Sequence, residues 1–104
     1  METYKHNIMG NIIARANGTM ENSVPANGTD YTLNELQRIV GGPIQIVNLG
    51  RFQLVVNEEG KLRRLPYNTI ATNWYLSFHF GVGVIPEAEY IVGDVLLCKN
   101  ECIK

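Results

Sequence analysis

One sharply bounded helix signal constrains the fold of this chain most strongly. Thr32 and Glu35 have the spacing of a capping box, in which each side chain accepts a hydrogen bond from the other residue's backbone amide. Gly41-Gly42-Pro43 ends the segment, because glycine adopts the left-handed cap conformation and proline cannot continue a helix. We therefore expect a helix over residues 32–40 with one apolar face. That face consists of Leu33, Leu36, Ile39 and Val40.

Short runs of β-branched residues before this helix predict strands and turns. Residues 7–15 are expected to form a first strand, and residues 20–24 a second, short extended segment. Asn17-Gly18 lies between the two segments, and Asn27-Gly28 follows the second. Asn-Gly is a strong turn signal because both residues tolerate positive φ, so a turn is predicted at each position.

A consecutive run of strands is predicted after the helix. Residues 44–49 have apolar side chains at alternate positions around Ile46, which indicates a strand with one buried face that includes Ile46. Residues 52–56 and 61–65 flank Asn57-Glu58-Glu59-Gly60, which has glycine late in a four-residue turn. We expect these two segments to pair as a hairpin.

A second helix and a last strand complete the predicted fold. Asn68 is expected to cap a helix that runs to about Phe78. Residues 90–98 are predicted as a strand with a bulge or tight bend at Gly93-Asp94. Strands in a consecutive run with segregated helices indicate an α+β fold. The prediction is one small mixed or mostly antiparallel sheet of about five strands, with two helices packed on one of its faces.

Composition and charge exclude several classes of partner. Lys and Arg number 9 against 10 Asp and Glu, so no strong field steers the chain to long nucleic acid. The low net charge also makes a homo-oligomer electrostatically easy. No apolar run approaches the ~20 residues of a membrane span, and residues 1–7 lack the profile of a signal peptide. We expect a single domain over residues 1–104 that works in the cytoplasm of a bacterial host cell, away from membranes.

Patterns typical of metal, cofactor or catalytic chemistry are missing from the sequence. Cys98 and Cys102 supply two of the four ligands of a structural zinc site, and His6 and His79 lie far away in sequence. We expect both cysteines to be reduced, and no metal or cofactor. Neither serine lies in a nucleophile elbow, and Gly81-Val82-Gly83 lacks the third glycine of a phosphate-binding loop. The prediction is a protein that is not an enzyme and has no catalytic residues.

The best candidate for a binding site is the segment Arg63-Arg64-Leu65-Pro66-Tyr67-Asn68 at the expected strand–helix junction. Free amides and the positive dipole end of a helix favour anions there, and arginine contacts phosphate with two parallel hydrogen bonds. Aromatic side chains that follow could stack on a base. These features are typical of a nucleotide site. The predicted ligand-binding residues are Arg63, Arg64, Tyr67, Asn68, Thr72 and Trp74.

A purely structural interpretation of the same residues stays open. Asn68 would then serve only as the helix cap, and Trp74 would fill the core. Arg63 and Arg64 would protect an edge strand from pairing with another chain.

Several stretches of the chain share the order and spacing of one protein family. With x for any residue, they are residues 32–42 (TLxELQxxVGG), 44–47 (IxxV), 54–62 (LVVNEEGKL), 65–72 (LPxNxxAT) and 91–96 (IVGDVL). Over about residues 32–98 the chain resembles the domain-of-unknown-function family numbered 3846, whose members occur in bacteriophages, plasmids and mobile elements. The resemblance implies a family-like core over residues 31–98, preceded by an N-terminal strand and turns over residues 1–30. It also implies a phage or mobile-element origin, and it brings no established reaction.

Three functional hypotheses follow from these observations. The first is a non-enzymatic binding protein of phage or mobile-element origin, a counter-defence factor that sequesters a small nucleotide-like signal, as a homo-oligomer with its site between subunits. The alternative is an inhibitor that binds a host defence protein directly through a sheet edge or the aromatic residues 74–80. A third and weaker hypothesis is an enzyme acting on nucleotides.

Overall fold

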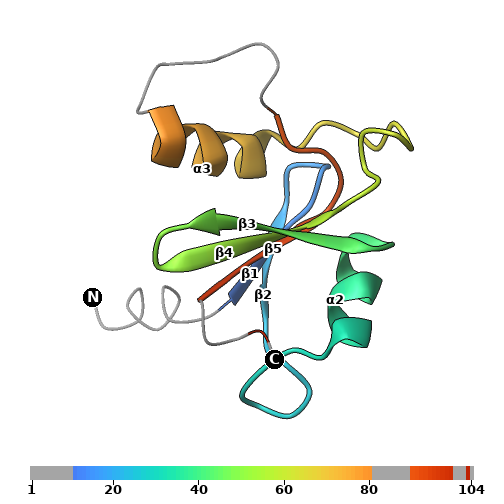
Figure 1. Ribbon diagram of the computed structural model, residues 1–104, viewed down its shortest axis with the longest axis vertical. Helices are drawn as coiled ribbons and strands as arrows, with labels where there is room; N and C mark the ends of the chain where they lie inside the picture. Colours follow the sequence, from blue (N-terminus) through green and yellow to red (C-terminus); the bar gives the residue numbers. More distant parts are fainter. Residues whose placement is uncertain (1–10, 81–89, 100–102, 104) are drawn as a thin grey trace.

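The fold is a five-stranded antiparallel sheet with one helix on each face. The computed structural model describes residues 11–80, 90–99 and 103. The strands lie in the order β2-β1-β5-β4-β3, and every neighbouring pair is antiparallel (Figure 1). The predicted α+β class with a mostly antiparallel sheet of about five strands is confirmed. The elements are β1 (Asn11–Ala14), β2 (Met20–Ser23), α2 (Leu33–Val40), β3 (Ile44–Leu49), β4 (Phe52–Asn57), α3 (Thr69–Phe80) and β5 (Val95–Lys99).

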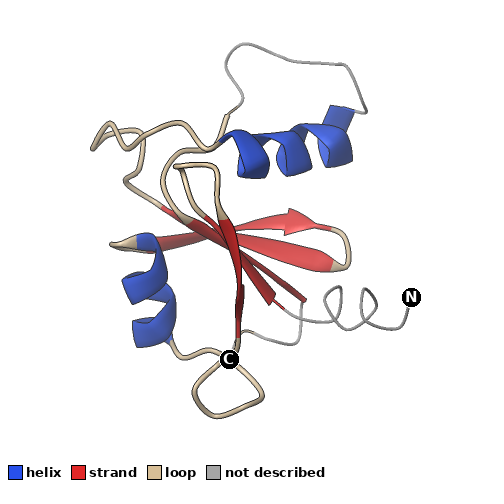
Figure 2. Cartoon of the chain, turned by 180° about the vertical axis from the view of Figure 1, so that it is seen from behind, coloured by secondary structure: helices blue, strands red, loops and turns tan. Residues whose placement is uncertain are grey.

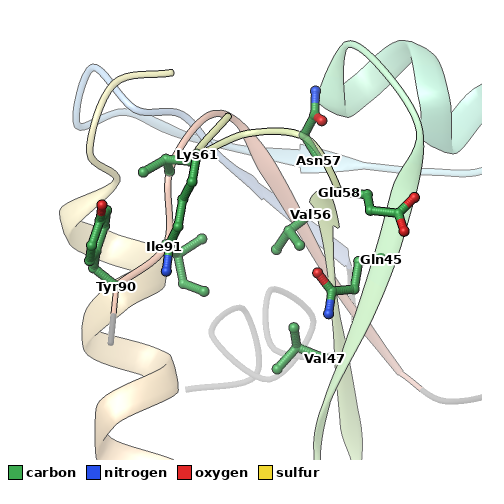
Figure 3. A pocket seen from close by; sticks show the side chains of 9 residues that line it. Gln45, Val47, Val56, Asn57, Glu58, Lys61, Tyr90 and Ile91 are labelled. Carbon is green, nitrogen blue, oxygen red and sulfur yellow. The ribbon is translucent and has the colours of Figure 1, made fainter. Parts of the chain in front are cut away.

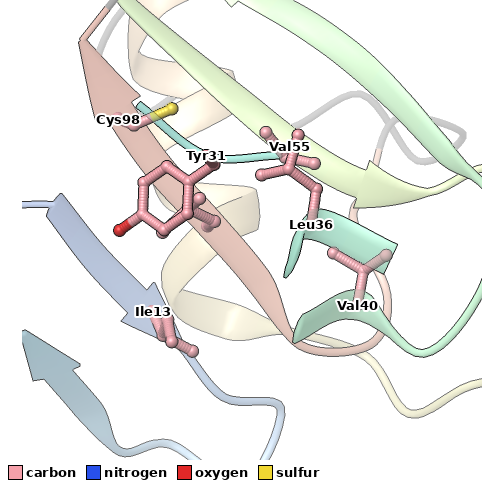
Figure 4. Close-up of a cluster of buried hydrophobic side chains, with 7 residues drawn as sticks. Ile13, Tyr31, Leu36, Val40, Val55 and Cys98 are labelled. Carbon is pink, nitrogen blue, oxygen red and sulfur yellow. The ribbon is translucent and has the colours of Figure 1, made fainter. Parts of the chain in front are cut away.

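The prediction that both helices lie on one face of the sheet is wrong. Figures 1 and 2 show α2 and α3 on opposite sides of the strands. Successive strand residues point to opposite faces, and β4 is apolar on both: Val55 packs with Leu36 of α2, whereas Leu54 packs with Ala71 of α3. Each apolar face of the sheet must be buried against another element, so one helix packs on each face. The cluster under α2 contains Ile13, Tyr31, Leu36, Val40, Val55, Leu96 and Cys98 (Figure 4).

Helix α2 begins and ends as its sequence predicts. The Thr32 amide donates to Glu35 Oε1 at 2.8 Å, and the Glu35 amide donates to Thr32 Oγ1 at 3.3 Å, which completes the capping box. Gly41 ends the helix with φ 81°, the left-handed conformation. The predicted apolar face is correct at Leu36 and Val40, but Leu33 at the first turn is 56% exposed.

The segment predicted as the second arm of a hairpin is instead a series of turns. Residues 61–64 are turns, closed by hydrogen bonds such as Arg63 N to the Glu59 carbonyl at 2.9 Å. Both sides of β4 are already paired, with β3 and β5, so no third strand can join it. The hairpin that does form joins β3 to β4 through Gly50-Arg51, where Gly50 has φ 75°.

The remaining strand predictions are correct in part. Both Asn-Gly turns form, with φ 95° at Gly18 and 84° at Gly28. The last strand starts at Val95 instead of residue 90, after the predicted bend at Gly93, which has φ 77°. Ile46 is 39% exposed and so does not lie on a buried face. Residues 7–10 of the first predicted strand lie outside the described residues.

No helix among the described residues has the length and apolar character needed to span a bilayer.

Candidate functional site

Asn68 is positioned inside the protein by three hydrogen bonds. Its Oδ1 accepts from the Ala71 amide at 2.9 Å, which is the predicted helix cap. Its Nδ2 donates to the carbonyl oxygens of Ala14 at 2.9 Å and Gly93 at 2.8 Å. The side chain is fully buried, so the structure gives Asn68 a structural role at the junction of α3, β1 and the segment before β5.

Thr72 and Trp74 also point toward the interior. Thr72 is 1% exposed, and its Oγ1 accepts from the Ile91 amide at 2.9 Å and donates to the Ile91 carbonyl at 3.3 Å. Trp74 is partly buried and packs on the cluster under α3 that contains Ala71. The two hydrogen bonds of Thr72 hold the segment before β5 against α3.

Arg63, Arg64 and Tyr67 lie on the surface. Arg63 Nη2 forms an ion pair with Glu59 Oε1 at 3.0 Å, one turn earlier. Arg64 is exposed and has a φ of 58°. Tyr67 is 50% exposed and stacks on Tyr90, with ring centres 5.8 Å apart. Of the six predicted ligand-binding residues, two are therefore buried, Trp74 is partly buried and three are exposed, and their contact with a ligand stays a prediction.

A groove lies between the sheet and the segment before β5 (Figure 3). One part of this groove has a volume of about 170 Å³ and a second part about 410 Å³. Val47 and Gln45 of β3 form one side of both parts, and Lys61, Tyr90 and Ile91 form the other. A groove of this size suits a small molecule.

Lys61 provides the positive charge of the groove. Its ammonium nitrogen lies 4.2 Å from the centre of the Tyr90 ring, a cation–π contact. Lys61 and Tyr90 form one wall of the groove, and Tyr67, which lines neither part of it, stacks on Tyr90. Glu58 and Gln45 lie across the groove from this wall (Figure 3). The groove thus offers an ammonium group, aromatic rings, an amide and a carboxylate around an apolar floor.

Sequence reasoning missed the groove, and none of the six predicted ligand-binding residues lines either part of it. Lys61 was interpreted as a strand residue, and Tyr90 as the first residue of the last strand. The groove forms because residues from β3, the turn after β4 and the segment before β5 meet in space. No local pattern connects Gln45, Lys61 and Tyr90, although a cation in a turn close to several tyrosines was a signal that could have been used.

A second hollow, on the α2 side of the junction, has a volume of about 420 Å³. Its cations are Arg15 and Arg38. Arg15 Nη1 lies 2.9 Å from Asp94 Oδ2, and its Nη2 lies 2.6 Å from Glu21 Oε2. The hydrogen bonds to Asp94 and Glu21 raise the pKa of Arg15. Two carboxylates already neutralise Arg15, which leaves Arg38 as the cation that this hollow offers to an anion.

Metal ligands do not gather within the described part of the chain, where no group of three or more His, Cys, Asp or Glu side chains could hold an ion. Cys98 is buried under α2. Cys102, His6 and the Glu87 and Glu89 carboxylates lie outside the described residues.

A family comparison identifies relatives of this chain. The family described as Domain of unknown function (DUF3846) matches residues 13–102. The protein belongs to that family. The match covers the resemblance of residues 32–98 and extends it toward the N-terminus, so it includes β2 to β5 and the second half of β1 of this DUF3846 domain. No curated protein matches the chain, and no solved structure matches it.

Proposed function

We propose that this DUF3846 protein is a non-enzymatic binding protein that captures a small anionic, nucleotide-like molecule in the groove beside β3. The observation that carries the proposal is the position of Lys61. Its ammonium group lies on the aromatic wall formed with Tyr90, and none of the ion pairs among the described residues includes it. An unpaired cation at the edge of an apolar groove is suited to a phosphate group.

The other lining residues fit the remaining parts of a nucleotide. Tyr75 lines the wider part of the groove and offers an aromatic face to a base. Gln45 offers an amide donor and acceptor to polar edges of a base or sugar. Glu58 can accept hydrogen bonds from sugar hydroxyl or base amino groups. The combination favours a nucleotide over a bare anion. A nucleotide base can pack on the apolar and aromatic surface of the groove, whereas a bare anion cannot.

Binding without turnover is part of the proposal. Arg15 and Glu35 have shifted pKa values, and both form contacts that hold the fold together. We propose that the groove holds its ligand without transforming it.

Calorimetry tests the proposal directly. Purified protein is titrated with cyclic nucleotides, ADP-ribose derivatives and ordinary nucleotides, and we expect heat with at least one class. Loss of a charged hydrogen bond costs about 1.5–3 kcal/mol, so Lys61→Ala should weaken binding by roughly 10- to 100-fold. Absence of heat with every compound, in a folded sample, would contradict the proposal.

Two charge-matched variants control for the loss of a positive charge. Arg51 lies in the β3–β4 turn and lines neither part of the groove, so Arg51→Ala should bind like the wild type. Arg38 lines the second hollow, and Arg38→Ala should also bind normally. A loss of binding confined to Arg38→Ala would move the site to the second hollow and contradict the proposal.

A direct inhibitor of a host protein is the alternative, and one observation favours it. Leu62, next to Lys61 in the turn after β4, is 83% exposed. Exposed apolar side chains beside a groove are typical of protein contacts when they form a patch, and Tyr67 is 50% exposed close by in the chain. Leu62→Glu should leave nucleotide binding unchanged under the first proposal and should abolish association with the host protein under the alternative.

We further propose that the protein comes from a phage or mobile element and that the captured molecule is a signal of bacterial defence. The basis is the association of such families with mobile elements and the ligand chemistry suggested above. Expression of the wild type in bacteria with a nucleotide-signalling defence should restore phage plaques, and expression of Lys61→Ala should not.

A further inference from the structure

We infer that the β3 edge of the sheet pairs with the β3 edge of a second copy of this chain, antiparallel and centred on Ile46. The inference rests on the hydrogen-bonding register and side chains of β3. It does not depend on the identity, or the existence, of a groove ligand.

Strand β3 is an edge strand in the described structure. It pairs with β4 along its whole length, and no described strand pairs with its other side. The Glu58 amide donates to the Pro43 carbonyl at 2.7 Å, which makes Pro43–Glu58 a hydrogen-bonded pair of the ladder. Such pairs alternate along antiparallel strands, so Gln45, Val47 and Leu49 also bond toward β4. The backbone groups that point outward therefore belong to Ile44, Ile46 and Asn48.

The outward-pointing groups of β3 are complementary to themselves. In an antiparallel pair with Ile46 opposite the partner's Ile46, residue 44 lies opposite the partner's Asn48 and residue 48 opposite the partner's Ile44. All three positions belong to the outward-pointing set, and each pair can exchange both its N–H···O=C bonds. Facing residues also share a face of the joint sheet, as a two-fold axis perpendicular to the sheet requires.

The side chains of β3 do not oppose this pairing. The strand reads Ile-Gln-Ile-Val-Asn-Leu and carries no charge, so the symmetric arrangement places no like charges opposite each other. It would cover Ile46, whose side chain is 39% exposed. Natural edge strands are usually protected by charges, proline or short length, and β3 has none of these over its six residues.

The opposite edge of the sheet differs in length and charge. Strand β2 has four residues, and it carries Glu21, which is bound to Arg15. Self-pairing of β2 would bring two copies of this charged pair together. Of the two edge strands, β3 is therefore better suited than β2 to pair with a second copy of the chain.

Pairing through β3 would also enlarge the groove. Gln45 and Val47 line the groove and lie on the α3 face of β3, and in this register Gln45 lies opposite the partner's Val47. The floor of each groove would then continue into the other copy. This gives a physical basis for a site that two subunits share.

Light scattering after size exclusion tests the inference on the full chain without ligand. We expect the wild type to be a dimer and Ile46→Lys to be a monomer, because two lysines would face each other at the axis. Met20→Lys on β2, where Met20 is 58% exposed, is the matched control and should stay a dimer. A monomeric wild type, or dissociation by Met20→Lys and not by Ile46→Lys, would overturn the inference.

A second variant separates pairing from folding. Ile46→Pro removes one outward N–H and leaves every bond toward β4 in place, so the chain should remain folded by circular dichroism and become a monomer. A folded Ile46→Pro protein that is still a dimer would also overturn the inference.

Cysteine cross-linking tests the register. In the inferred pair the two Cα atoms of residue 46 are about 5.5 Å apart, within the range for a disulfide. Ile46→Cys should therefore give a covalent dimer under mild oxidation, with a 46–46 linkage in peptide mapping. Asn48→Cys should not, because its two copies are roughly 13 Å apart along the strands. Equal cross-linking of both variants would rule out this register.

Discussion

The side-chain amide of Asn68 donates to the backbone carbonyl of Ala14 at 2.9 Å, across 54 positions of sequence. The same nitrogen donates to Gly93, and the same side chain caps α3. One buried asparagine therefore connects the start of α3, the end of β1 and the bend before β5. Because it is fully buried, nothing outside the protein can replace these bonds.

Replacement of Asn68 by alanine should be strongly destabilising. Loss of the cap costs about 1 kcal/mol, and each carbonyl left buried without a donor costs about 1–3 kcal/mol. We expect the free energy of unfolding, measured in urea, to fall by at least about 3 kcal/mol. Asn73→Ala in the same helix, where the side chain is exposed, is the control. Equal stability of the two variants would contradict the role assigned to Asn68.

The capping box of α2 predicts a pH dependence of stability. The backbone amides of Thr32 and Ala26 donate to Glu35 and lower its carboxyl pKa below the ordinary value of 4.5. The unfolded chain therefore takes up this proton first as the pH falls. The stabilisation is complete above pH 4.5 and is lost as the pH falls through the lower pKa of the folded state.

Glu35→Gln measures this contribution, because glutamine keeps the capping geometry without a titrating group. Urea unfolding from neutral pH down to about pH 3 should show a shallower loss of stability in Glu35→Gln than in the wild type. Parallel curves for the two proteins would show that the Glu35 contacts are absent in solution.

Gly60 is required by close packing in the turn that carries Lys61. A Cβ at this position would lie 2.7 Å from Val92 Cγ2 and 3.2 Å from the Asn57 carbonyl oxygen. Gly60→Ala should destabilise the protein by about 1–3 kcal/mol, the usual cost of overpacking. Combining it with Val92→Ala should cost less than the sum of the two single changes, as measured in a double-mutant cycle. Additive costs would show that the two sites are independent.

Lys61 and the pair Arg63 and Arg64 distinguish the groove from the strand–helix junction predicted by the sequence. In the groove proposal, Lys61→Ala weakens nucleotide binding by roughly 10- to 100-fold, and Arg63→Ala/Arg64→Ala changes it little, because Arg63 is paired with Glu59. The junction hypothesis predicts the reverse order. Calorimetry of the two variants with the same ligand decides between them.

Local patterns in the sequence identified the elements that local interactions form. The capping box at Thr32, the stop at Gly41 and the cap at Asn68 were all predicted, because each depends on residues within a few positions of one another. The turns at Gly18 and Gly28 belong to the same class, since a positive φ is a property of the residue itself. These parts of the fold were determined by the sequence alone.

Long-range pairing decided the rest. Residues 61–65 were predicted as a strand that pairs with β4. Because β4 pairs with β3 on one side and β5 on the other, residues 61–64 form turns instead. The helices divide between two faces because the central strands are apolar on both. Gln45, Lys61 and Tyr90 line the groove together. Their proximity depends on the strand order, which no local sequence pattern indicates. Hydrogen bonds and burial between distant segments are properties of the folded chain, and only the tertiary structure could reveal them.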